Sequence, residues 1–122
     1  MGLQDWKVRE MAKRQHEIIF NLSKQLPREE LYSLTDQIRR SCRSVVANLA
    51  EAYAKRRYPL HMISKLTDAD GENAETREWL QMMISCNYFS APELETVLDL
   101  NNQINKLLNY MIIHKDMFAF KL

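Results

Sequence analysis

The sequence contains few of the residues that interrupt helices. Only two glycines and three prolines occur among 122 residues, which leaves few places for turns. Gly2 and Gly71 are far apart, so no glycine-rich phosphate-binding loop can be built from them. Leucine, alanine, glutamate, lysine and arginine, which favour helices, are abundant. The composition therefore predicts a helical protein.

Long hydrophobic runs are missing as well. No stretch of about 18 apolar residues occurs, so we expect no membrane-spanning segment. The segment MGLQDWKVRE is charged from Asp5 onward and has no apolar core of a secretory signal. Trp6 stands where the myristoylation pattern needs serine or threonine. These observations predict a cytoplasmic protein without a membrane partner.

An excess of one charge is also absent, because the formal net charge is +1. The whole molecule therefore has no field that attracts nucleic acid, and any such role needs a local patch. Cysteine is scarce too. Cys42 and Cys86 lie on separate predicted helices, and we expect free, buried thiols, with a disulfide as the alternative.

The sequence lacks the residue groupings that catalysis and metal binding need. His16, His61 and His114 lie on three different predicted helices, each without a cysteine or second histidine at ligand spacing. No histidine follows a glutamate by three residues, as the di-metal signature of helix bundles requires. No histidine shares a helix face with Ser41 or Ser44, so no activated nucleophile is indicated. We expect no enzymatic activity, no cofactor, no metal and no small-molecule substrate.

The sequence does contain four segments in which apolar residues recur at spacings of three and four. They span residues 5–25, 35–57, 59–86 and 90–114, within a single domain over residues 1–122. Pro27 and Pro59 mark two of the joints. Thr35 suits the N-cap of the second helix, and Ser90 with Glu93 forms a capping-box pattern before the fourth. Four amphipathic helices with short connections predict an all-α, antiparallel up-and-down four-helix bundle.

The fourth segment has more apolar surface than one bundle seam needs. Its two apolar rows are Leu94, Leu98, Leu108 and Ile112, and Val97, Leu100, Ile104, Leu107 and Met111. Large exposed apolar surfaces usually mark interfaces, so we expect a homo-oligomer. The alternative is that the C-terminal tail, with Met117, Phe118 and Phe120, folds back over this helix.

The second helix carries most of the positive charge. Six basic residues and one acid between Arg39 and Arg57 give +5, whereas two basic residues and five acids between Leu60 and Cys86 give −3. Arg39 and Arg43 fall on one flank of the apolar stripe, and Asn48 falls on the other. In the first interpretation these arginines fasten helices together, by pairing with acids of the third helix.

Polar residues also interrupt the apolar stripe of the third helix. Asp70, Asn73 and Arg77 fall on this stripe, whereas Glu75 lies on another face. Buried polar groups are costly unless they are paired, so these three residues should have specific partners. For Arg77 we expect a carboxylate or a carbonyl.

The second interpretation assigns the basic residues to nucleic acid. Arg40, Arg43, Lys55, Arg56 and Arg57 would contact phosphates, and Tyr53 and Tyr58 would stack on bases. No recognised DNA- or RNA-binding motif is present. Fastening is the leading interpretation, and the two roles are compatible.

Three segments resemble a known family. YSLTDQIRRSCRSVVANLAEAYAKR is similar to the pattern YGLTxQIRRAAxSIxxNIAEG of bacterial four-helix-bundle proteins encoded in intervening sequences of large-subunit rRNA genes. DADGENAETREWLQMM is similar to AxGSxxExExxL of that family, and LPREELYSLT stands where the family has FPxxExYGLT. The resemblance covers residues 13–112.

The resemblance implies a homopentamer with no known catalytic activity. It places the family's recurrent polar positions on Gln37, Arg39, Arg40, Asn48, Glu51 and Glu75. Ala52 stands where the family has glycine, and Glu72 replaces a serine. The fold is also distantly similar to the accessory variability determinant of diversity-generating retroelements, which binds reverse transcriptase and nucleic acid but is strongly basic.

Two functions are therefore expected. The first is a non-enzymatic oligomeric scaffold whose helix-two arginines fix helix and subunit contacts. The second is an RNA-binding adaptor, serving rRNA intervening sequences or a retroelement reverse transcriptase. The partners expected are further copies of the chain, and RNA or another protein.

Overall fold

Four long helices account for most of residues 2–120, the part of the chain described by this computed structural model. They are α1 (Lys7–Ser23), α2 (Leu34–Ala54), α3 (Pro59–Ser85) and α4 (Glu95–Ile113). The shorter elements are the 3-10 turns η1 (Leu3–Asp5), η2 (Arg28–Glu30) and η3 (Pro92–Leu94) and the helix α5 (Lys115–Phe118). No strand occurs within this described part, and the fold class is all-α, as predicted.

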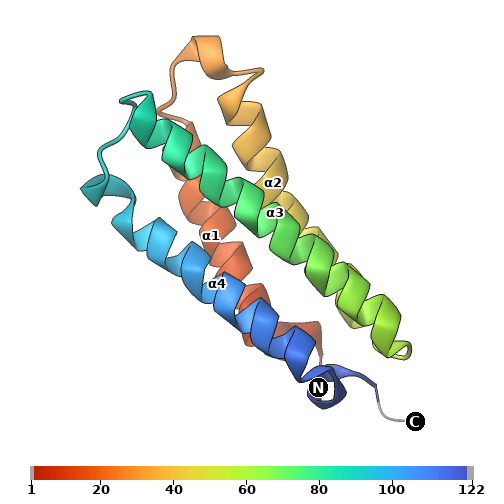
Figure 1. The fold of residues 1–122 in the computed structure, drawn as a ribbon. Helices are drawn as coiled ribbons and strands as arrows, with labels where there is room; N and C mark the ends of the chain where they lie inside the picture. The colour runs from red at the N-terminus through yellow and green to blue at the C-terminus, as the bar shows by residue number, and fades with distance from the viewer. Residues whose placement is uncertain (1, 121–122) are drawn as a thin grey trace.

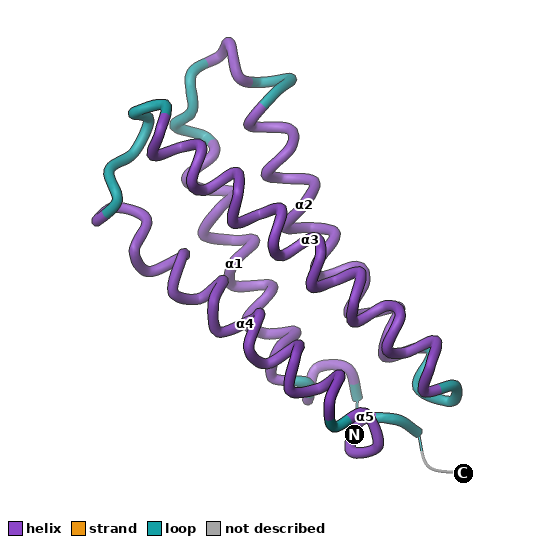
Figure 2. Tube along the Cα trace, viewed as in Figure 1, coloured by secondary structure: helices purple, strands orange, loops and turns teal. Residues whose placement is uncertain are grey.

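The long helices run alternately in opposite directions (Figure 1). α1 packs on α2 and α4, and α3 packs on the same two helices, so that neighbours in sequence are neighbours in space. Figure 2 shows the connections at the two ends of the bundle; the N-terminus, the α2–α3 turn and the C-terminal segment share one end. In the described residues no helix is both long enough and apolar enough to cross a bilayer.

The helix boundaries differ from the prediction at all three joints. α2 begins at Leu34, whose amide donates to Glu30 Oε1 at 3.3 Å, and Thr35 is buried inside the helix rather than capping it. The Ser90–Glu93 capping box is present, with the Ser90 amide donating to Glu93 Oε1 at 2.9 Å. It opens η3, however, and α4 itself begins at Glu95. The end of α2 also lies earlier than predicted, at Ala54.

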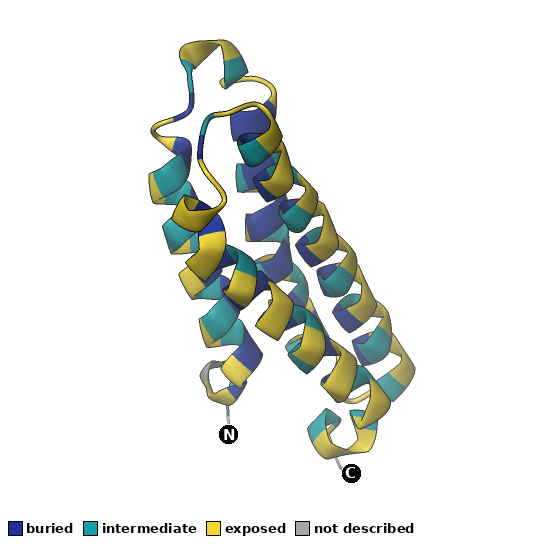
Figure 3. Ribbon diagram, turned by 60° about the vertical axis from the view of Figure 1, so that its left-hand side comes forward, coloured by how far each residue is buried: buried dark blue, intermediate teal, exposed yellow. Residues whose placement is uncertain are grey.

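The apolar interior is divided into two clusters. One lies towards the end that holds the termini and includes Trp6, Ala12, Leu49, Met62 and Leu108. The other lies towards the opposite end and includes Ile19, Ile38, Leu80, Phe89 and Leu94. In Figure 3 the buried residues follow the inward side of each helix and the exposed residues follow the outward side.

A layer of buried polar side chains lies in the middle of the bundle. Gln15, Asn73 and Asn101, from α1, α3 and α4, are each no more than 2% exposed. Gln15 Nε2 donates to Asn73 Oδ1 at 3.1 Å, and Asn101 Nδ2 donates to Gln15 Oε1 at 2.9 Å. Asn73 Nδ2 donates to the Asn101 carbonyl at 3.0 Å. Three helices are therefore joined in one register, because a shift along any of them would leave buried amides unpaired.

The remaining long helix, α2, is joined to α3 beside this layer through hydroxyl groups. Thr76 Oγ1 donates to Ser41 Oγ at 2.8 Å, and both residues are buried between α3 and α2. Cys42 is buried beside Ser41, and burial raises the pKa of its thiol to about 12. Cys86 is also a free thiol, but it is exposed, so the expectation that both cysteines are buried is wrong for Cys86.

The C-terminal tail covers part of α4. The Phe118 ring packs edge-on against Trp6 and Tyr110, at centroid distances of 6.2 and 6.4 Å. The Phe120 amide donates to the Arg56 carbonyl at 2.8 Å, which ties the tail to the α2–α3 turn. The alternative in which the tail folds back is therefore confirmed for α5.

Candidate interaction surface

A polar groove follows the outer boundary between α2 and α3. Its volume is about 480 Å³, and its lining residues are Gln37, Arg40, Ser41, Arg43, Ser44, Ala47, Glu72 and Glu75. We call this boundary the polar seam and extend it to Asn48, Glu51, Lys65 and Asp68, the next polar residues along it. Six predicted site residues lie on the seam: Gln37, Arg40, Arg43, Asn48, Glu51 and Glu75.

Charges in the part of the seam around Arg40 are only weakly paired. Arg40 Nη1 lies 4.0 Å from Asp36 Oδ2, and the Arg40 side chain is 72% exposed. The pKa of the Glu72 carboxyl is raised by burial and by the negative charge of Glu75, while Arg40 acts in the opposite direction. The exposed guanidinium and the crowded carboxylates leave polar groups available for contact with another molecule.

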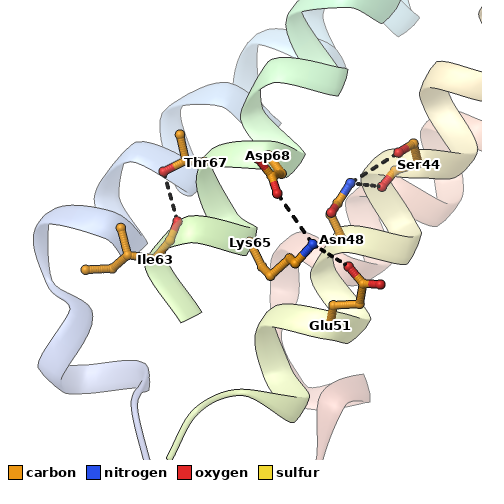
Figure 4. A network of polar contacts seen from close by, with 7 residues as sticks. All are labelled: Ser44, Asn48, Glu51, Ile63, Lys65, Thr67 and Asp68. Carbon is orange, nitrogen blue, oxygen red and sulfur yellow. Dashed lines mark hydrogen bonds and ion pairs between the residues drawn. The ribbon is translucent and has the colours of Figure 1, made fainter. Parts of the chain in front are cut away.

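In the part of the seam around Glu51 and Lys65, an ion pair joins the two helices (Figure 4). Lys65 Nζ lies 3.1 Å from Glu51 Oε2 and 3.5 Å from Asp68 Oδ2. Asn48 Nδ2 donates to the Ser44 carbonyl at 2.9 Å and to Ser44 Oγ at 3.1 Å. Glu51 and Lys65 therefore fasten α2 to α3. Lys65 was not among the predicted site residues, although its position three residues before Asp68 was a visible signal.

Arg39 and Arg43 are not paired with acids of α3, contrary to our prediction. Arg39 Nε donates to Ser23 Oγ at 2.8 Å, and Arg43 Nε donates to His16 Nε2 at 3.0 Å. Both acceptors belong to α1, so the expected pairing of these arginines with acids of α3 is wrong. Arg39 faces α1 because that helix packs on this flank of α2, and Arg43 lies between α1 and the seam, which it also lines.

Asp70 and Arg77, two polar residues of α3 outside the seam, face α4. Asn105 Nδ2 donates to Asp70 Oδ1 at 2.8 Å. Arg77 Nη1 donates to the side-chain oxygens of Asn101 and Asn102. The partners of Arg77 are thus amide oxygens rather than carboxylates, and they connect the buried polar layer to the surface.

Lys55, Arg56 and Arg57 lie at the α2–α3 turn, near one end of the bundle. Lys55 and Arg57 are exposed. The Arg56 guanidinium lies 3.6 Å from the centroid of the Tyr53 ring, and its Nε donates to the Tyr53 carbonyl at 2.8 Å. Tyr53 also packs edge-on against Trp6, so its ring is engaged in the fold rather than displayed for stacking.

The five basic residues assigned to nucleic acid therefore do not form one continuous stripe. Arg40 and Arg43 lie mid-way along α2, and Lys55 to Arg57 follow about 20 Å further along the helix axis, at a rise of about 1.5 Å per residue. Arg40 lies on the seam, and Arg43 lies between the seam and α1.

The described residues hold no cluster of three or more His, Cys, Asp or Glu side chains that could bind a metal ion. The arrangement of the seam and its neighbouring charges is suited to contact with another macromolecule through ion pairs and hydrogen bonds.

Comparison with known proteins gives a matching family and solved structures of similar fold, one of which is described below. The family model of the 23S rRNA-intervening sequence protein matches residues 4–110. A crystal structure of a protein with unknown function from the S23 ribosomal protein family of Bacteroides thetaiotaomicron VPI-5482 is similar, with a TM-score of 0.78. The two chains are 32% identical, and the match covers 86% of this chain and 97% of that chain. No curated protein matches this chain.

Proposed function

We propose a function for this chain, which belongs to the 23S rRNA-intervening sequence protein family. The proposed function is that of a non-enzymatic, homo-oligomeric helical scaffold of the cytoplasm. The similar crystal structure is itself of a protein with unknown function, so the proposal rests on the surfaces of this chain. The number of subunits we propose is five, as the resemblance to the family implies.

The observation that carries this proposal is a group of exposed apolar side chains at one end of the bundle. We call this group the apolar end; its members are Tyr58, Leu60, Tyr110, Ile113, Met117 and Phe120, which are between 44% and 75% exposed. They come from the α2–α3 turn, the start of α3, the end of α4 and the tail, which lie at the same end in Figure 1. Exposed apolar groups of this kind usually mark an interface, and a second copy is the partner we propose.

The α2 arginines take different roles in this proposal. Arg39 fastens α2 to α1, and Arg56 fastens the α2–α3 turn to the tail. Arg40 is left exposed on the polar seam, so it is the arginine we propose for a subunit contact. Such contacts fix the relative orientation of subunits more than they add affinity.

Native mass spectrometry of the untagged protein tests the proposal, with five copies of the chain expected. The variant Leu60→Gln/Ile113→Gln removes two of the most exposed members of the apolar end, and we expect it to lower the oligomer mass. The matched control is Leu31→Gln/Tyr32→Gln, which changes exposed apolar residues near η2, away from the apolar end. A monomeric wild-type protein, or equal masses for both variants, would overturn the proposal.

The second candidate function is an RNA-binding adaptor. The observation that favours it is a predominantly basic groove between α1 and α2 of about 340 Å³, whose lining includes Arg9, Lys13, His16 and Arg43 together with one acid, Glu17. A polyanion would bind such a groove through salt-dependent contacts. Binding of a labelled RNA that weakens steeply as salt rises is the expected result, and a protein that ignores RNA at low salt would rule this candidate out.

A further inference from the structure

Three cationic side chains converge on one phenyl ring at the α1–α2 boundary. Lys24 Nζ lies 4.8 Å from the centroid of Phe20, Arg39 Cζ lies 4.9 Å from it, and Arg43 Cζ lies 5.8 Å from it. Lys24 directly follows the end of α1, four residues after Phe20, and the two arginines are one turn apart on α2. We call these four residues the Phe20 cluster.

Neutral groups hold both guanidinium groups in place. Arg39 Nε is bound to the hydroxyl of Ser23, which in turn donates to the Phe20 carbonyl at 2.7 Å. Arg43 Nε is bound to His16 Nε2, which accepts the hydrogen bond and is therefore unprotonated. Burial and the Arg43 charge both lower the pKa of His16, so the imidazole stays neutral at pH 7. The Nε–H group of each arginine therefore donates to a neutral acceptor. The terminal Nη groups of both arginines are held in position but have no hydrogen-bond acceptor within the described residues.

The positive charge of this cluster is not balanced by ion pairs. Within residues 2–120, the acids that form ion pairs do so with Arg9, Arg40 and Lys65, and not with the cations of the Phe20 cluster. The three cations lie within roughly 10 Å of one another, about the Debye length at 0.1 M salt, so their repulsion is not fully screened. Contact with one ring offsets only part of this repulsion, since a cation–π contact at an exposed site contributes about 0.5–1 kcal/mol.

We propose that Lys24, Arg39 and Arg43 form a binding site for a phosphate group, with Phe20 as its apolar support. Arginine presents paired donors that match phosphate oxygens, and lysine adds a point charge. Arg40 is unsuited to the same role, because it forms an ion pair with Asp36 at 4.0 Å and its charge acts on the Glu72 carboxyl. The basic groove between α1 and α2 begins at Arg43, so a polynucleotide bound at the cluster would continue along Arg9 and Lys13. The proposed site rests on the second candidate function, because RNA would supply the phosphate group.

Two probes test the site on the full-length protein. Inorganic phosphate is titrated while the Nε–H signals of Arg39 and Arg43 are followed by NMR, and we expect both to shift. A labelled single-stranded RNA is titrated by fluorescence anisotropy at several salt concentrations. The test variant is Lys24→Gln/Arg43→Gln, and the matched control, Arg28→Gln/Lys106→Gln, removes the same charge at exposed positions outside the Phe20 cluster and the α1–α2 groove. Thermal unfolding by circular dichroism establishes that both variants are folded.

The expected result is that the test variant loses about tenfold or more in RNA affinity and that its log–log salt slope falls by about two, while the control changes little. Unshifted arginine signals together with equal RNA binding by all proteins would overturn the site and leave RNA binding to another surface. Phosphate shifts without any RNA binding would support the site and rule out the second candidate function. If neither probe binds, both fail. An oligomer that dissociates in the test variant, without phosphate shifts in the wild type, would make the cluster a subunit contact and overturn the site.

Discussion

The buried amides of Gln15, Asn73 and Asn101 define how the helices are aligned. Each amide both donates and accepts, and the three come from three different helices. An apolar interior alone tolerates sliding of one helix against another, because hydrophobic contact is not directional. Paired polar groups do not, since an unpaired buried donor or acceptor costs about 1–3 kcal/mol. The layer is therefore best understood as a device for register.

Replacing Asn101 with alanine tests this role. The substitution leaves Gln15 Oε1 without its donor and opens space in a packed layer, so we expect a loss of about 3 kcal/mol in the free energy of unfolding. Urea denaturation measures it. Asn109→Ala, at an exposed position of the same helix, is the control and should be neutral or slightly stabilising. A loss below about 1 kcal/mol for Asn101→Ala would contradict the register role.

Glu72 gives a prediction about pH. Burial and the charge of Glu75 raise the pKa of its carboxyl above the ordinary value of 4.5 in the folded state. The folded protein then binds more protons than the unfolded chain just above that value, so the contribution of Glu72 to stability falls as pH rises through this window. We expect Glu72→Gln to be more stable than the wild type at about pH 7. Chemical denaturation across this pH range should show the difference vanishing below about pH 4, and a constant difference would show that charge is not the cause.

Among the helices, α3 has the least regular pattern. Its buried side combines Met62, Leu66 and Leu80 with the polar Asn73 and Thr76. This mixture follows from its position, because α3 packs on both α2 and α4 and carries polar partners for each. The apolar periodicity of α3 is therefore weak, and its inward side becomes regular only when the paired polar residues Asn73 and Thr76 are counted as part of the interior.

Gly71 is the weak point of this helix. It is exposed in the middle of α3, and a Cβ added there would meet nothing within 4 Å. Glycine disfavours helix interiors by about 1 kcal/mol relative to alanine, so Gly71→Ala should stabilise the protein by about that amount. Thermal unfolding followed by circular dichroism measures the change. A lower melting temperature, or a lower oligomer mass in the same variant, would mean that another chain approaches this position closely.

At the scale of the whole molecule, apolar and charged surfaces are separated. The apolar end lies beside the termini, while the polar seam and the Phe20 cluster lie on the sides of the bundle. Under the proposed function, contacts through these surfaces respond differently to ionic strength, because salt screens charges but does not weaken apolar burial.

This difference is the basis of a test. Raising NaCl from about 0.1 M to about 1 M should leave the oligomer mass unchanged if the apolar end holds the subunits together. Light scattering coupled to size-exclusion chromatography measures the mass. Arg40→Gln should change the mass little at either salt concentration, since an exposed ion pair contributes at most about 1 kcal/mol. Dissociation in high salt would show that the charged surfaces, and not the apolar end, make the main subunit contact.

The sequence by itself determined the all-α class, the number of long helices and most of their limits, because helical periodicity and prolines are local signals. It also indicated that Asp70, Asn73 and Arg77 need partners, since a polar residue on an apolar stripe is costly unless it is paired. It could not place Arg39 and Arg43, because a helical wheel gives the flank of α2 on which they lie but not whether α1 or α3 packs there. That choice depends on the direction in which the chain winds around the bundle. Only the tertiary structure decides it, and with it the convergence of three cations on Phe20.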